Sequence, residues 1–496
     1  MNQKVCIAMI PCPGISHLIP LIEFAKQLVL HHKNFHVTFL IPTLGSPTPS
    51  TKSILNSLPP NIDYTFLPQI NIQDLPPNIH IATQMKLTVK HSLPHLDQAV
   101  STMLTSPKPK NNLVALVFDV FSSDVIHIAK KFNLMTYFFA ASSVIAIQVC
   151  LTLPKLDESV SSEFLDTTQT LDIPNSNVSF KVKDLPDPVL FGKSSETYKA
   201  FLLLCRRLSL ADGVIVNSFT DLEPDIVKST QDSVSVYPIG PIIQRESKSK
   251  ENGLKCIRWL NNKPSKSVLF ISFGSGGTLT VEQINEIAFG LELSGCNFLW
   301  IVRVPNKLSC SAYFKGQNGN SNSNSNSNSK SDFDDDPLNY LPLGFLERTK
   351  DQGLVVPSWA PQVEILSHGS TGGFLSHCGW SSCLEGLVYG VPMIAWPLYA
   401  EQRMNAATLS DVFKVAVRPR IDEQDGVIKG EEVARVIKII MDGEGLKLRR
   451  RIEEVRDGAE AALREDGSSR MALSRLVSKW EEKASQKIEV VSTNGI

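Results

Sequence analysis

The segment HCGWSSCLEG, residues 377–386, places a histidine, two cysteines and a glutamate within ten residues, so it could bind a metal, act as a nucleophile or contact a ligand. Structural zinc sites usually have two short ligand pairs, and no cysteine follows Cys383. A cysteine nucleophile needs a base beside it, but neighbouring side chains of a strand, such as His377 and Cys378, point to opposite faces. Neither chemistry is favoured, and we interpret the cysteines as packing residues.

The same segment has the pattern of a phosphate-binding turn. An apolar strand, TGGFLSH, leads through Gly379 into an expected helix up to residue 389, which Ser381 or Ser382 could cap. The free N–H groups at the start of a helix bind phosphate. His377 and Ser382 could donate to phosphate oxygens, and Glu385 could accept from a ribose diol. A purely structural strand–helix turn explains this stretch about equally well when it is taken alone.

Two neighbouring strand ends add groups suited to a nucleotide sugar. Trp359 ends the strand GLVVPSW as a flat platform for a base, and Gln362 follows it with an amide for the base edge. Glu401 and Gln402 follow the strand PMIAW and suit sugar hydroxyls. Because parallel strands bind ligands at their carboxyl ends, we expect these groups to meet in one crevice.

A candidate general base lies in the other half of the chain. His17 follows the strand KVCIAMI and starts a helix, whose positive end disfavours the charged imidazolium and leaves the ring able to accept a proton. Asp119 ends the strand LVALVFD and could orient this imidazole. Asp124 is an alternative partner, although it lies inside the helix expected at FSSDVIHIAKKF. Ser142 and Ser143 could reach a sugar from this half.

Strands and helical patterns alternate through both halves, which predicts an α/β fold with parallel sheets. We expect one domain over residues 1–240, a linker over 241–254, a second domain over 255–475, and a helix or tail over 476–496 that packs back on the first domain. The Asn/Ser-rich stretch at about 315–336 is expected to be a disordered loop. Asp332 and Asp334 follow it as D-x-D, and we interpret them as a solvated acidic run rather than a metal site.

Composition excludes several classes of protein. The 496 residues carry a formal net charge of −1, which disfavours nucleic acid and anionic membranes as partners. Nine scattered cysteines are typical of reduced thiols in a cytoplasmic protein. No stretch reaches the roughly 18 apolar residues of a membrane span. We therefore expect a cytoplasmic protein, and we expect it to be a monomer.

The block WAPQVEILSHGSTGGFLSHCGWSSCLEGLVYGVPMIAWPLYAEQ, residues 359–402, resembles the signature box of plant secondary-product UDP-glycosyltransferases. FGSGGTLT and GISHLIP agree with it, and the details are most similar to the branch that glucosylates hydroquinone and monolignol-type phenols. The resemblance implies a GT-B fold, in which two Rossmann-like domains face each other across a cleft. It also implies a role for each matching residue: uracil for Trp359, Ala360 and Gln362; ribose for Glu385; phosphates for His377, Ser382, Ser275 and the backbone of Trp380; the sugar for Glu401 and Gln402; catalysis for His17 and Asp119.

The expected activity is an inverting transfer of glucose from UDP-glucose to a small phenolic acceptor, with no metal and no cofactor. Ser381 departs from the family's asparagine and puts one phosphate or sugar contact in doubt. That departure motivates an alternative, a non-catalytic binder of nucleotide sugars, which the presence of His17 and Asp119 disfavours. A dehydrogenase is also disfavoured, because FGSGGT lacks the G-x-G-x-x-G spacing. The acceptor pocket is expected around residues 79–93, 121, 140–150 and 183–190.

Overall fold

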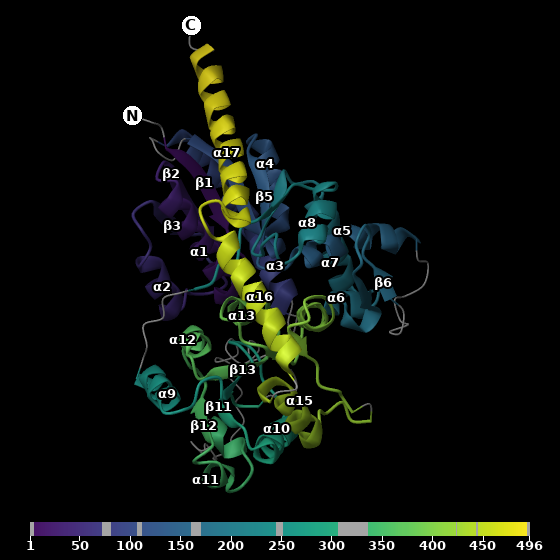
Figure 1. The fold of residues 1–496 in the computed structure, drawn as a ribbon. Coiled ribbons are helices and arrows are strands. Elements are labelled where there is room, and N and C mark those ends of the chain that lie inside the picture. Colours follow the sequence, from purple (N-terminus) through teal and green to yellow (C-terminus); the bar gives the residue numbers. More distant parts are fainter. Residues whose placement is uncertain are drawn as a thin grey trace, which may run out of the picture.

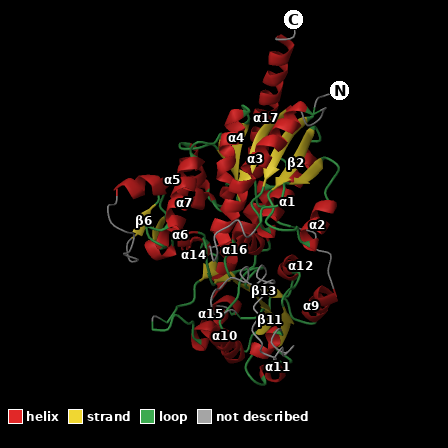
Figure 2. Cartoon of the chain, turned by 180° about the vertical axis from the view of Figure 1, so that it is seen from behind, coloured by secondary structure: helices red, strands yellow, loops and turns green. Residues whose placement is uncertain are grey.

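The chain folds into two α/β lobes, one above the other in Figure 1. The computed structural model describes residues 4–71, 81–106, 112–159, 170–244, 251–305, 336–422, 424–442 and 445–493. The Asn/Ser-rich stretch with Asp332 and Asp334 lies outside these residues. Figure 2 shows the two lobes from behind, each built around its own sheet.

The first lobe contains a seven-stranded parallel sheet in the order β3-β2-β1-β4-β5-β8-β9. Its central strands are buried along their whole length, as expected for a parallel sheet covered on both faces. The strands are β1 (Val5–Ile10), β2 (Phe35–Ile41), β3 (Ile62–Phe66), β4 (Leu113–Asp119), β5 (Met135–Ala140), β8 (Gly213–Val216) and β9 (Val236–Pro238).

Helices connect these strands, and a small antiparallel hairpin of β6 (Thr170–Asp172) and β7 (Ser179–Lys181) lies beside them. The helices are α1 (Ile15–His31), α2 (Pro49–Asn56), α3 (Ile81–Thr105), α4 (Ile126–Lys131), α5 (Val144–Ser159), α6 (Asp187–Leu190), α7 (Glu196–Leu208) and α8 (Pro224–Gln231). The single helix expected after β4 is instead a 3-10 helix, η3 (Val120–Val125), followed by α4. A second 3-10 turn, η4 (Val182–Asp184), precedes α6.

The second lobe repeats the plan with a six-stranded parallel sheet in the order β12-β11-β10-β13-β14-β15. Alternation of strands and helices in the sequence predicts this repetition. The strands are β10 (Val268–Ser272), β11 (Asn297–Val302), β12 (Gly353–Pro357), β13 (Thr371–Ser376), β14 (Met393–Ala395) and β15 (Ala416–Val417).

In the second lobe, residues at both ends of helix α10 explain where it begins and ends. Thr280 caps it by accepting from the N–H of Gln283, and Gly295 ends it in the left-handed conformation at φ 65°. The helices are α9 (Glu251–Asn261), α10 (Val281–Ser294), α11 (Phe345–Arg348), α12 (Gln362–Ser367), α13 (Trp380–Val388), α14 (Gln402–Ala407), α15 (Gly430–Met441), α16 (Leu446–Ala462) and α17 (Ser468–Thr493), with η6 (Pro337–Tyr340) and a π turn η7 (Thr408–Val412).

The last helix, α17, runs along the first lobe and away from the second (Figure 1). Trp480 on this helix is completely buried, with ring centroids 5.9 Å from Phe35 and 5.6 Å from Tyr137. Asn34 donates to the carboxylate of Glu481 at 2.8 Å. The end of the described chain therefore completes the apolar core of the first lobe.

Several expected boundaries can be placed on these elements. Helix α9 begins at Glu251, inside the segment 241–254 expected as a linker. The boundary expected at residue 475 falls within α17, which is one helix from residue 468 onward. Within the described part of the chain, none of the helices is both long and apolar enough to cross a bilayer.

Candidate active site

The order of the first sheet brings His17 and Asp119 together. Strand β1 lies between β2 and β4, so the chain leaves β1 toward one edge and later returns to its other side. Ligands of open α/β sheets bind at such a switch point, outside the carboxyl ends of the strands. His17 lies in the first turn of α1, directly after β1, and Asp119 is the last residue of β4. Both side chains are therefore at the switch point.

His17 and Asp119 form a hydrogen-bonded pair. Nδ1 of His17 lies 2.9 Å from Oδ2 of Asp119, while Oδ1 accepts from the N–H of Phe121 at 2.9 Å. An ionised carboxylate only accepts hydrogen bonds, so Nδ1 carries the hydrogen and Nε2 is the nitrogen able to take a proton. The His17 side chain keeps 27% of its surface exposed and Asp119 only 6%, so the base faces solvent and its partner does not.

The surroundings of His17 raise its pKa. Burial alone would lower it, but the charge and hydrogen bond of Asp119, together with the charge of Glu401, outweigh burial. The helix end alone predicts a ring held neutral, but the two carboxylates act in the opposite direction and outweigh it. The structure thus describes a base with raised affinity for a proton.

Cys12 is a third group at this position that sequence reasoning overlooked. Ligand atoms of Cys12, His17 and Asp119 lie within 4.8 Å of one another, the spacing of a possible metal site among the described residues. Burial and the neighbouring Asp119 keep the pKa of the Cys12 thiol well above its usual range, so the thiol stays protonated. Its side chain is 1% exposed. A protonated, buried thiol is a poor metal ligand, and the pair of His17 and Asp119 is better suited to proton transfer.

The alternative partner, Asp124, is used elsewhere. Its carboxylate pairs with Arg207 of α7 at 2.7 Å, and both side chains are largely buried. Ser143 is likewise occupied, because its hydroxyl accepts from the N–H of Ala146 at the start of α5. Ser142 is half-buried, so it is the one of the two serines that remains a candidate for contact with the sugar.

The second sheet has its own switch point, between β10 and β13, and His377 follows β13 there. Its ring fits between two glycines: a Cβ added to Gly274 or Gly379 would lie 2.5 or 2.6 Å from ring atoms. Burial, and then the charge of Arg303, lowers the pKa of His377 to about 4, so the ring is neutral at pH 7. Within the described structure, its buried Nδ1 has no hydrogen-bond partner. A neutral imidazole with an unmatched nitrogen is suited to binding a ligand oxygen.

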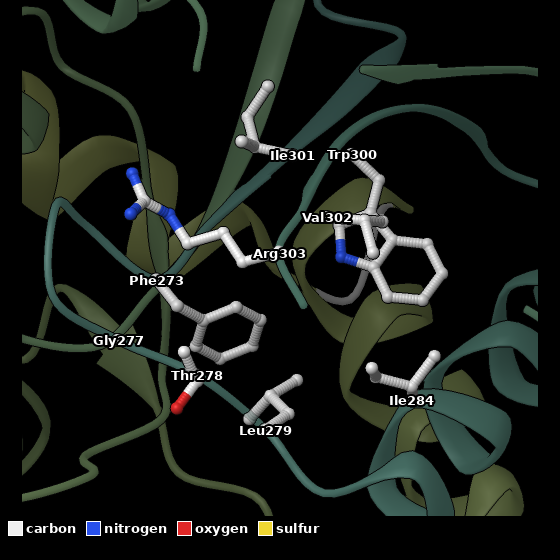
Figure 3. A pocket seen from close by; sticks show the side chains of 9 residues that line it. All are labelled: Phe273, Gly277, Thr278, Leu279, Ile284, Trp300, Ile301, Val302 and Arg303. Carbon is white, nitrogen blue, oxygen red and sulfur yellow. The ribbon is translucent and has the colours of Figure 1, made fainter. Parts of the chain in front are cut away.

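Arg303, at the end of β11, is a second group that sequence reasoning overlooked. Figure 3 shows its guanidinium turned away from the apolar side chains of Leu279 and Ile284. Its Nη1 donates to the carbonyl of Ser275 at 2.6 Å and so holds the turn after β10. This turn and the β13–α13 turn lie side by side, because β10 pairs with β13. Arg303 therefore adds positive charge beside the expected phosphate site.

Helix α13 starts differently from the expectation. Its N-cap is Gly379 without a side-chain hydrogen bond, so neither Ser381 nor Ser382 caps it, because a glycine already provides the extended backbone there. The first-turn N–H groups thus lack a side-chain cap, as a phosphate site requires. Ser381 is exposed and Ser382 buried. The indole of Trp380 donates to the carbonyl of Asn217 in the first lobe at 2.8 Å, which ties this turn to the opposite lobe.

The groups expected to hold the nucleoside also come together. The amide nitrogen of Gln362 donates to Glu385 at 2.6 Å and to Ser382 at 2.8 Å, which leaves its oxygen for a base edge. Burial raises the pKa of Glu385 to about 7, although the bond from Gln362 opposes the shift. Trp359 has 44% of its surface exposed, as a stacking platform must, and Ala360 beside it is buried.

The turn after β14 presents Glu401 and Gln402. The side-chain oxygen of Gln402 accepts from the N–H groups of Leu398 and Tyr399 at 2.9 and 3.1 Å. Its amide nitrogen is therefore the end that can donate to a sugar hydroxyl. Burial raises the pKa of Glu401, and the charge of His17 opposes this shift. Each of these two groups affects the pKa of the other, so Glu401 of the second lobe and His17 of the first lobe lie near each other.

A cavity of about 460 Å³, large enough for a small aromatic molecule, is lined by Cys12, the neighbour of His17 and Asp119, but not by His17 or Asp119 themselves. It extends from Cys12 and Gly14 to Gln84, Met85 and Thr88 of α3. Of the four stretches expected to line an acceptor pocket, it uses only residues 84–88. The other wall lies outside the expected stretches and is formed by residues 41–48, 50 and 51, from the end of β2 into α2.

The structure has two lobes with parallel sheets, a base at the switch point of the first sheet and a helix start without a side-chain cap at that of the second. This arrangement agrees with the GT-B transferase fold that the resemblance of residues 359–402 implies. Residues 245–447 match the family described as "UDP-glucoronosyl and UDP-glucosyl transferase". Hydroquinone glucosyltransferase of Rauvolfia serpentina is 47% identical over 98% of this chain and 100% of its own length.

Solved structures agree with this comparison. Phytolacca americana UGT2, complexed with UDP-2fluoro-glucose and pterostilbene, has a TM-score of 0.85 at 42% identity, over 96% of this chain and 100% of its own. A UDP-glucosyltransferase from Polygonum tinctorium capable of glucosylating indoxyl has a TM-score of 0.86 at 40% identity, over 97% of this chain and 100% of its own. The chain belongs to the UDP-glycosyltransferase family. The non-catalytic alternative finds no support in these relatives, which are named as transferases.

Proposed function

We propose that this enzyme transfers glucose from UDP-glucose, with inversion at the anomeric carbon, to the hydroxyl of a small phenolic molecule. The observation that carries the proposal is the hydrogen bond of 2.9 Å between His17 and Asp119, next to a cavity of about 460 Å³. The names of the relatives agree with it, since one is a hydroquinone glucosyltransferase and another was solved with a UDP-sugar and pterostilbene.

The reaction begins with the acceptor hydroxyl at Nε2 of His17. This nitrogen takes the hydroxyl proton while the oxygen attacks C1 of glucose, and Asp119 stabilises the imidazolium that forms. The bond from C1 to the diphosphate oxygen breaks on the opposite face, and UDP leaves with the electron pair. A phenol has a pKa near 10 and loses its proton more readily than an alcohol, so it suits a single histidine base.

The second lobe binds the leaving group and the sugar. N–H groups at the start of α13, neutral His377 and Ser382 donate to the diphosphate, whose charge they stabilise as it develops. Trp359, Ala360 and Gln362 hold uracil and Glu385 the ribose. The remaining assignments are Ser275 and the backbone of Trp380 to phosphate, and Glu401 and Gln402 to glucose.

The acceptor side is apolar, and the proposal includes no metal or other cofactor. Leu18, Ile41, Phe66 and Met85 give the cavity an apolar lining for an aromatic ring. We further propose that the enzyme works as a monomer in the cytoplasm. The eight cysteines among the described residues are all free thiols, which agrees with a reducing compartment.

A transfer assay tests this proposal. Purified enzyme is incubated with UDP-glucose and, separately, hydroquinone, coniferyl alcohol and a flavonol, and both UDP release and glucoside formation are measured. The expected result is a β-glucoside from at least one phenol, since the donor glucose is α-linked and inversion reverses it. An α-glucoside would contradict the inverting mechanism, and UDP release without glucoside from any phenol would contradict the acceptor class.

A further inference from the structure

Asp187 of the first lobe contacts the turn that carries the proposed glucose ligands of the second lobe. Its backbone N–H donates to the carbonyl of Ala400 at 3.0 Å, and its Oδ2 accepts from the N–H of Ala400 at 2.6 Å. Its Oδ1 pairs with the guanidinium of Arg403. The Asp187 side chain is only 16% exposed. One aspartate thus engages both ends of a four-residue turn across the lobe boundary.

The turn needs such support because of its backbone. Ala400 has φ 59°, the left-handed region that non-glycine residues rarely adopt and that costs about 1 kcal/mol or more. Both of its backbone polar groups are held by Asp187. Glu401 and Gln402 follow immediately, so the direction of their side chains depends on the conformation of Ala400. Without the carboxylate of Asp187, the N–H of Ala400 and the guanidinium of Arg403 lose their acceptor. The turn is then free to relax, and the side chains of Glu401 and Gln402 move away from the position proposed for the sugar.

We propose that Asp187 is a positioning residue for donor-sugar recognition, which fixes Glu401 and Gln402 from the acceptor-binding lobe. This inference rests on the proposed function, in which those two residues hold glucose. Recognition of the sugar is then completed by the lobe that binds the other substrate, and full affinity for UDP-glucose requires both lobes in contact.

A second ion pair between the lobes supplies a matched control. Asp184, three residues before Asp187, accepts from both terminal nitrogens of Arg418 at 3.1 and 2.5 Å, and its side chain is 6% exposed. It joins the same two lobes with similar burial, but its partner lies after β15 and not in the turn after β14. Loss of Asp184 therefore weakens lobe contact without releasing Ala400.

The test compares binding of UDP-glucose with binding of UDP, by titration calorimetry on the full chain. In Asp187→Ala, the ratio of the two dissociation constants, UDP-glucose over UDP, should rise about tenfold, since the side-chain hydrogen bond to the N–H of Ala400 and the ion pair with Arg403 are lost, while the backbone bond to the carbonyl of Ala400 remains. In Asp184→Ala the ratio should stay within twofold of wild type. Arg403→Met, which keeps the bonds to Ala400, should raise the ratio less than Asp187→Ala does.

Two outcomes would overturn the inference, and a third variant separates it from the proposed function. An unchanged ratio in Asp187→Ala, or an equal rise in Asp184→Ala, shows that Asp187 has no special role in sugar binding. If Asp187→Ala does not fold, judged by thermal denaturation, Arg403→Met alone decides, and an unchanged ratio there overturns the inference. Gln402→Ala reports on the proposed sugar site itself: if this variant leaves the ratio unchanged, the assignment of the site is wrong.

Discussion

Replacing Asp119 by Asn should both slow the transfer and move its pH dependence to lower pH. The carboxylate uses one oxygen for the N–H of Phe121 and the other for His17. Asparagine has a single oxygen, so when that oxygen caps Phe121 its amide nitrogen faces Nδ1 of His17. The ring then loses its charged acceptor, and the tautomer with the hydrogen on Nε2 is favoured. In this tautomer Nε2 is unable to accept the proton of the acceptor hydroxyl.

The fall in rate and the change in the pKa of His17 both follow from the free energy of the hydrogen bond between His17 and Asp119. A hydrogen bond to a charged group is worth about 1.5–3 kcal/mol, which corresponds to a fall in kcat of roughly 10- to 150-fold. The same loss lowers the pKa of His17, because the charge and hydrogen bond of Asp119 are what favour the imidazolium. In the wild type, Asp119 and Glu401 raise this pKa, and the base is active only when unprotonated. Activity should therefore rise with pH through a pKa above the usual value of histidine, and this rise should move downward in Asp119→Asn.

The assay is the pH profile of kcat/KM for one phenol from about pH 5 to 9, below the range where phenols themselves ionise. Asp124→Asn is the matched control, because Asp124 pairs with Arg207 and not with His17. Its acidic limb should coincide with that of wild type. An acidic limb that stays in place in Asp119→Asn, with kcat within twofold, would refute the role of Asp119.

Three further outcomes are expected. His17→Ala should lower turnover by roughly 10²–10⁴-fold while the dissociation constant of UDP changes little, and near-normal turnover would remove His17 from the mechanism. EDTA should not inhibit, and deletion of residues 318–331 together with Asp332→Asn and Asp334→Asn should leave the rate intact; a rate lost with these aspartates and restored by a metal would show a metal-dependent reaction. Ser381→Asn should lower the KM for UDP-glucose with an unchanged melting temperature, since Ser381 is exposed and does not cap α13; an equal or higher KM would mean that serine already makes the contact.

Local patterns predict the strands and the groups at their ends. The run VCIAMI predicts β1, Val5–Ile10, and the same logic places His17, Asp119 and His377 at the carboxyl ends of strands. The prediction of one helix after β4 is only partly correct. Asp119 accepts from the N–H of Phe121 and starts a 3-10 helix, and the α-helix begins only at Ile126. Such a cap competes with an α-helix and depends on the buried carboxylate.

Contacts between distant parts of the chain were not predictable in this way. Asp187 and Ala400 are 213 residues apart, and neither lies in a motif that would suggest the pairing. In the sequence, Cys12 is indistinguishable from an ordinary core residue, and only the pairing of β1 with β4 places Asp119 beside it. Arg303 likewise gains its place next to His377 only through the pairing of β11, β10 and β13. Each of these needs the order of the strands, which hydrophobic periodicity does not determine.

The course of α17 affects the order in which the chain can fold during synthesis. Trp480 packs on Phe35 and Tyr137, so the core of the first lobe lacks a part until residue 480 has left the ribosome. The second lobe has its own core and can fold earlier, although its sequence comes later than most of the first lobe. The same fact governs the construction of chimeric enzymes. A chimera that exchanges acceptor-binding lobes between relatives must transfer residues 468–493 with residues 4–244, or the new lobe receives a foreign helix in its core.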